Sequence, residues 1–213
     1  MTSAYDGLYL ERARVTLGSM LDYAVWDLQF NLSRFYSLFI STGAAERFGR
    51  GEASFTVGRS GPELAWDVLE RSGLSYPAVR PAYRSERSSE YWTGWALAYY
   101  QWRSGRPFRE IEECVPIEMV CTFYNPYHEM DVEQFADRME EIVSRELEGM
   151  RETTLARYRK YAQLSQSGLA KRSGVSVRTI QQYEQRRKDI GKAGEDQVVN
   201  LGKALGCPIS RVF

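Results

Sequence analysis

Helical periodicity is the main pattern in the first part of the chain. From Leu17 onward, apolar residues recur at steps of three, four or seven, the spacing of one helical face. They are Leu21, Leu28, Leu32, Phe35 and Phe39. We therefore expect one helix over 17–41 that ends at Ser41-Thr42-Gly43, because glycine adopts the left-handed conformation that closes many helices.

Further helices are predicted downstream, and together they indicate a mostly α fold. Ser60-Gly61-Pro62-Glu63 has the form of a capping box, in which the serine and the glutamate side chains satisfy free amides at a helix start. The residues from Gly73 to Arg87 include two prolines and no helical period, so we expect a connection there. Asp131 is expected to cap a helix whose apolar face includes Phe135, Met139 and Ile142.

A very aromatic helix is expected from about Ser88 to Trp102. Trp92, Trp95, Tyr99 and Trp102 lie on one stripe, which indicates core packing. Tyr91 and Tyr100 lie off that stripe. Aromatic side chains are enriched at binding surfaces, so we expect Tyr91 or Tyr100 to be left for a partner or ligand.

The distribution of charge indicates two domains. The net charge is zero, yet the chain from Arg151 onward carries 13 Lys+Arg against 5 Asp+Glu, and the first 150 residues carry 15 against 23. A basic domain joined to an acidic one is typical of a nucleic-acid-binding protein with a second, partner-binding part. We expect domains at 1–148 and 149–213, with Gly149 either a hinge or a point within one connecting helix that continues toward Leu155 and Tyr158.

Residues 164–184 have the pattern of two short helices joined by a tight turn. Ser165 and Ser176 stand where helix N-caps belong, because a hydroxyl accepts from free first-turn amides. Gly174 occupies the turn between them, where a positive backbone angle or close packing excludes a side chain. The inward positions are Leu169 and Ala170 in the first helix, and Ile180 and Tyr183 in the second.

The outward positions of the second helix are suited to reading DNA. A helix in the major groove presents its N-terminal residues to base edges, where arginine pairs with guanine and glutamine with adenine. The expected base-contacting residues are Val177, Arg178, Thr179, Gln181 and Gln182. The expected phosphate-contacting residues are Gln166, Ser176, Arg186, Arg187 and Lys188, since such contacts position the protein on the duplex.

This stretch resembles the Cro/phage-repressor (XRE-type) helix-turn-helix family over about 60 residues. Besides the core motif, Tyr183-Glu184-Gln185-Arg186 stands where the family ends its recognition helix. The tail from Val199 to Ile209 is similar to the family's fourth helix and the turn into its fifth. The resemblance implies a five-helix lambda-repressor-like domain that binds a double-stranded DNA operator as a homodimer. Arg186 replaces the family's usual glycine, which puts the local backbone geometry in question.

The N-terminal region resembles small bacterial regulators found beside toxin-like ADP-ribosyltransferase genes. The similarity lies in Gly94-Trp95-Ala96-Leu97-Ala98-Tyr99-Tyr100-Gln101-Trp102 and in the segment from Tyr124 to Asp131. The resemblance assigns no activity to this region, but it implies an antitoxin as an alternative role.

Metal, cofactor and enzyme interpretations find no support in the sequence. Cys114, Cys121 and His128 are seven residues apart, whereas structural zinc needs four ligands with closely spaced pairs. One histidine cannot be placed beside either thiol from sequence, and no phosphate-binding glycine loop is present. We expect no metal, no cofactor and no enzymatic activity.

The sequence also has no apolar run long enough to span a bilayer and no signal peptide, so we expect a cytoplasmic protein. The favoured function is a transcriptional regulator, most simply a repressor of its own promoter. Two alternatives stay open: an antitoxin whose N-terminal domain neutralises a toxin partner, and a regulator that senses a small molecule.

Overall fold

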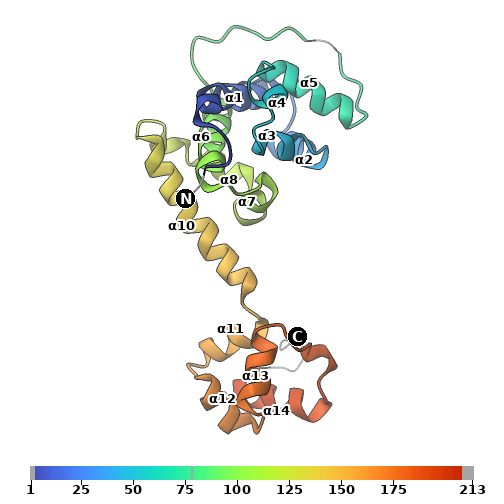
Figure 1. The fold of residues 1–213 in the computed structure, drawn as a ribbon, viewed down its shortest axis with the longest axis vertical. Helices are drawn as coiled ribbons and strands as arrows, with labels where there is room; N and C mark the ends of the chain where they lie inside the picture. The colour runs from blue at the N-terminus through green and yellow to red at the C-terminus, as the bar shows by residue number, and fades with distance from the viewer. Residues whose placement is uncertain (1–2, 78, 208–213) are drawn as a thin grey trace. The chain divides into compact units, whose positions relative to one another are not determined.

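The protein is a chain of helices. A computed structural model describes residues 3–77 and 79–207, with the backbone alone at 149–151. Every regular element in these ranges is a helix (Figure 1), so the mostly α prediction is confirmed. The chain divides into two compact units, unit 1 (Met1–Arg145) and unit 2 (Glu146–Phe213). Over the described ranges, no helix combines the length and the apolar character needed to cross a bilayer.

Short helices make up most of both units. The elements that begin in unit 1 are η1 (Gly7–Tyr9), α1 (Leu10–Trp26), α2 (Leu32–Ser41), α3 (Ala44–Gly49), α4 (Ala53–Thr56), α5 (Gly61–Arg71), α6 (Ser89–Ser104), α7 (Phe108–Cys114), α8 (Ile117–Thr122), α9 (Tyr124–Tyr127) and α10 (Val132–Arg151). Those of unit 2 are α11 (Thr154–Tyr161), α12 (Gln166–Ser173), α13 (Val177–Glu184), η2 (Ile190–Lys192) and α14 (Glu195–Leu205).

Helix α1 is the centre of unit 1 and packs against α6 and α5 (Figure 1). The two helices α1 and α6 approach so closely that a Cβ at Gly94 would lie 2.6 Å from the carbonyl oxygen of Leu17. Only glycine permits this contact between backbones. The crossing therefore depends on Gly94, which lies in the middle of α6.

The expected single helix over 17–41 is wrong, because the chain breaks between α1 and α2. Gln29 adopts a left-handed backbone with φ of 58°. Asn31 then starts α2, its side chain accepting a hydrogen bond from the Arg34 amide at 3.0 Å. Leu28 and Phe30 in the connection are buried like the helical positions around them, so the apolar period continues through a segment that is not helical.

Three other predicted boundaries agree with the structure. The capping box of Ser60 and Glu63 is formed at the start of α5, and the Glu133 amide donates to Asp131 at the start of α10. The described residues between Gly73 and Arg87 form no helix. The Ala82 amide and the Arg84 guanidinium of this connection both bond to the Asp27 carboxylate, which ties it to the end of α1.

The aromatic helix α6 is buried on more sides than its sequence suggests. Tyr91, Trp92 and Tyr100 are all buried, and the Tyr100 hydroxyl donates to Glu140 of α10 at 2.9 Å. The expectation that Tyr91 or Tyr100 is left for a partner is therefore wrong: neighbouring helices cover both. Of the stripe predicted to pack in the core, Trp95, Tyr99 and Trp102 are only partly buried. The guanidinium of Arg14 lies 3.4 Å from the Trp95 ring centroid.

Helices α10 and α11 are separate, so the expected alternative of one helix continuing to Leu155 and Tyr158 is wrong. Helix α10 includes Gly149 and ends at Arg151. Helix α11 has its own N-cap, Thr153, whose side chain accepts from the Ala156 amide at 3.2 Å. An N-cap stabilises a helix start by satisfying a backbone amide that would otherwise be unpaired. Because α11 has its own N-cap, it is a separate helix and not a continuation of α10.

Candidate nucleic-acid interface

Helices α12 and α13 form the predicted pair of helices joined by a tight turn. Ser165 caps α12 and Ser176 caps α13, each accepting a hydrogen bond from a backbone amide three residues on. Gly174 ends α12 with φ of +69°, the left-handed conformation that favours glycine. The helix ends thus lie where the sequence predicts them.

The inward positions of this pair hold it in a small core. Leu169, Ile180 and Tyr183 are buried as predicted, and Ala170 packs against the same cluster. The other buried members of the cluster are Leu155, Val175, Leu201 and Leu205. All of them lie in unit 2, so α13 is held by α11, α12 and α14 through apolar contacts, which are the main source of stability in such a domain.

The predicted base-contacting residues lie on the outward side of α13. Arg178 and Gln181 are exposed, and Val177 retains 38% of its surface. Thr179 and Gln182 are only half-buried, and the Thr179 hydroxyl lies 2.8 Å from that of Ser176. Thr179 and Ser176 already share this hydrogen bond, and Arg178 and Gln181 are the exposed polar side chains of the set.

A polar network joins the first helix of the pair to the second. The Gln166 amide donates to Glu184 at 2.8 Å and accepts from Gln181 at 3.3 Å. The structure therefore brings together a residue predicted to contact phosphate and one predicted to contact a base. A side chain held from two sides is preorganised, which lowers the entropy lost on binding.

Arg159 and Glu184 complete this network, and neither was predicted as a site residue. Arg159 donates two hydrogen bonds to the Glu184 carboxylate and a third to the Leu164 carbonyl. The hydrogen bonds to Glu184 raise the pKa of Arg159 above its usual value, against the opposing effect of burial. The feature of the sequence that could have indicated this pair is Glu184 itself. It directly follows Tyr183, which is buried in the core, and a carboxylate in such a position needs a cationic partner.

The basic segment after α13 begins with an unusual backbone. Arg186 has φ of 54°, so the backbone at this position is left-handed. The family that this stretch resembles usually has glycine here, the residue that adopts this conformation most readily. The amides of Arg187 and Lys188 both donate to the Gln182 carbonyl, which closes the end of the helix. Arg186, Arg187 and Lys188 are all exposed, as phosphate contacts require.

The remaining helix of the unit also follows the prediction. Helix α14 ends at Gly206 with φ of +67°, matching the expected fourth helix of the domain. The turn at Pro208 and Ile209, and the fifth helix expected after it, lie outside the described residues.

Residues 153–212 match the family model of a helix-turn-helix domain. The match begins at the N-cap of α11 and covers the network and the core described above. Neither the curated proteins nor the solved structures include a match to this chain. Unit 2 therefore contains a helix-turn-helix domain.

Cys114, Cys121 and the histidine His128 belong to unit 1. The His128 ring stacks on Tyr124 with centroids 4.1 Å apart, and its Nδ1 lies 2.8 Å from the Tyr124 carbonyl oxygen. Cys114 is buried and Cys121 partly so. Within the described part of the chain, no three residues of the His, Cys, Asp and Glu types are grouped as metal ligands would be.

Proposed function

We propose that the protein is a sequence-specific DNA-binding transcriptional regulator. The observation that supports this best is the outward side of α13. It presents Arg178 and Gln181 beside a capped helix start, and three exposed basic residues follow the helix. In helix-turn-helix proteins this part of the second helix enters the major groove.

In the proposed complex the two classes of contact come from different segments. Arg178 would donate to guanine, Gln181 or Gln182 would pair with adenine, and Val177 would contact a thymine methyl group. Arg186, Arg187 and Lys188 would neutralise phosphates on one side of the groove. Gln166 would contribute at the start of α12, where the helix dipole also favours an anion.

We infer further that the protein acts as a dimer on a palindromic operator in its own promoter. The first 150 residues carry 15 Lys+Arg against 23 Asp+Glu, and this negative net charge does not favour contact with DNA. We therefore assign dimerisation to this part of the chain. Half-sites about one helical turn apart follow from such symmetry. Occupancy would block polymerase, so the regulator would be a repressor, and this role needs no catalysis.

The test is binding of the full chain to DNA from upstream of its own gene. Fluorescence anisotropy should give tighter binding to this duplex than to a shuffled duplex of equal composition, with affinity that falls as salt rises. Arg178→Ala should reduce the preference, whereas Lys203→Ala, a matched change of an exposed basic residue on α14, should keep it. Equal affinity of the wild-type protein for both duplexes would contradict sequence-specific regulation at this promoter.

The dimer is tested separately. Sedimentation of the full chain should give twice the monomer mass at micromolar concentration. A monomer that still binds the operator fully would contradict the proposed role of the first unit and leave the DNA-binding proposal standing.

A further inference from the structure

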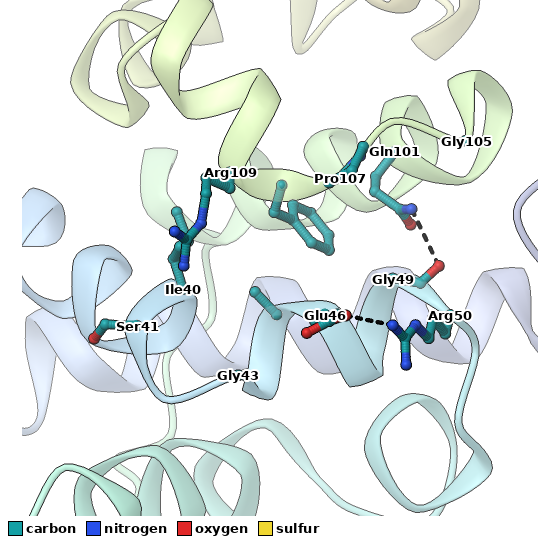
Figure 2. A pocket seen from close by; sticks show the side chains of 12 residues that line it. Ile40, Ser41, Gly43, Glu46, Gly49, Arg50, Gln101, Gly105, Pro107 and Arg109 are labelled. Atoms are coloured by element: carbon teal, nitrogen blue, oxygen red, sulfur yellow. Dashed lines mark hydrogen bonds and ion pairs between the residues drawn. The ribbon is translucent and has the colours of Figure 1, made fainter.

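Unit 1 contains a pocket that the proposed function does not use. It has a volume of about 590 Å³ and lies where α2, α3, α6 and the start of α7 meet. Figure 2 shows Ile40 and Arg109 on one side of it, and Gln101 and Gly49 on the other. Its size falls in the range of pockets that bind small molecules.

Part of the pocket wall is apolar. Ile40, Ala45, Pro107 and Phe108 contribute to them. The Phe108 ring itself is fixed, since it packs edge-on against Phe39 and Phe48 with centroids 5.6 and 5.9 Å apart. These side chains suit the apolar body of a ligand. The wall formed by Phe108 is preformed, because the Phe108 ring belongs to the core.

Gln101 gives the pocket one oriented polar group. Its side chain is 2% exposed, and its amide nitrogen donates to the carbonyls of Gly49 at 3.2 Å and Arg106 at 3.4 Å. Two carbonyl partners fix the nitrogen on their side of the amide. The oxygen Oε1 is therefore left on the other side, where it accepts no hydrogen bond from the described residues. Buried acceptors without a donor are costly and rare in native proteins.

Arg109 gives the opposite side of the pocket a cation. Its side chain is exposed, and it forms no ion pair with any residue in the described ranges. The other arginine at the pocket, Arg50, is already paired with Glu46 (Figure 2). The charge still available to a ligand is thus positive and lies across the pocket from Gln101.

We propose that this pocket binds a small carboxylic acid whose apolar body carries a hydroxyl or N–H donor. The carboxylate would pair with Arg109, the body would lie between Ile40 and Phe108, and the donor would satisfy Oε1 of Gln101. Binding here does not depend on the proposed DNA-binding function, and its test does not use DNA.

The experiment titrates the full chain with three matched probes by calorimetry. The first is para-hydroxyphenylacetate, the second is phenylacetate, which lacks the hydroxyl, and the third is para-hydroxyphenylacetamide, which lacks the charge. The first should bind more tightly than either of the others by about threefold to tenfold, the usual effect of one hydrogen bond or one partly exposed ion pair.

Two variants separate the two contacts. Arg109→Ala should abolish the preference for the acid over the amide and keep the preference for the hydroxyl. Gln101→Met, which keeps the length of the side chain, should do the opposite. Thermal melting identifies a variant that fails to fold, and Arg109→Ala, which changes an exposed residue, carries the test alone in that case. Arg34→Ala, an exposed arginine of α2 outside the pocket, should leave both preferences unchanged. The proposal is overturned if wild-type protein does not bind para-hydroxyphenylacetate, or if Arg34→Ala reduces its binding as much as Arg109→Ala.

Discussion

Arg159 of α11 and Glu184 of α13 share two hydrogen bonds, from Nε to Oε1 at 2.7 Å and from Nη2 to Oε2 at 3.0 Å. Their side chains retain 13% and 7% of their exposed surface. Removing the arginine leaves a buried carboxylate without its charge partner. We expect Arg159→Ala to lower the free energy of unfolding of unit 2 by about 3 kcal/mol, measured by urea denaturation.

The matched control is Arg157→Ala, an exposed arginine on the same helix, which should change the free energy of unfolding by less than about 0.5 kcal/mol. If the two variants have equal stability, the pair does not hold α13 to α11.

A second prediction concerns the left-handed backbone at Arg186. A side chain in this conformation costs about 1 kcal/mol, while glycine loses more entropy on folding. Arg186→Gly should therefore raise the free energy of unfolding by up to about 1 kcal/mol, and it should weaken DNA binding because a basic side chain is lost. The neighbouring change Arg187→Gly, at a position without positive φ, should lower both quantities. A destabilised Arg186→Gly protein would contradict the assigned strain.

A third prediction separates base contacts from phosphate contacts. Arg178→Ala should reduce the preference for the operator by about 1–3 kcal/mol. Arg187→Ala should weaken operator and shuffled DNA alike and reduce the slope of log affinity against log salt by about 1. Anisotropy titrations at several salt concentrations measure both effects. Uniform losses in both variants would show that the two classes of contact are wrongly assigned.

A fourth prediction concerns the Glu112 carboxyl in unit 1. Burial, with a smaller contribution from the Glu118 charge, raises its pKa from 4.5 to about 7. The folded chain therefore favours the neutral acid, and the cost of ionising it appears as the pH rises from 4.5 to about 7. Glu112→Gln removes this cost. It should stabilise the protein above about pH 7 by roughly 1 kcal/mol, a value reduced because the carboxyl is partly exposed.

Thermal melts at about pH 4 and pH 8 test this linkage. The two proteins should melt alike at the lower pH and differ at the higher one. Glu113→Gln, an exposed neighbour on α7, should show no such difference. A Glu112→Gln protein that gains nothing at high pH would contradict the raised pKa.

The features of unit 2 that could be predicted from sequence are local ones. Ser165, Gly174 and Ser176 act on residues three or four positions away, so a short stretch of sequence contains the information. The contact of Arg159 with Glu184 joins residues 25 positions apart, and no spacing rule identifies it. The outward residues of α13 were recognisable because the buried Ile180 and Tyr183 define the opposite side.

Unit 1 shows where periodicity fails. The apolar period does not reveal the break between α1 and α2, because Leu28 and Phe30 are buried in a segment that is not helical. The sequence also does not reveal what packs against α6. Tyr100 donates a hydrogen bond to Glu140, which is 40 residues further along the chain. An off-stripe aromatic residue indicates an exposed ring only when a single side of its helix is packed.

The separate N-cap at Thr153 has a consequence for how such chains diversify. Because α11 starts from its own cap and the buried cluster around α13 draws only on residues that follow it, recombination upstream of position 153 would leave every contact of that cluster intact. The helix-turn-helix domain is therefore expected to keep its fold when it is joined to a different first unit, so such domains can be exchanged between chains as complete folding units.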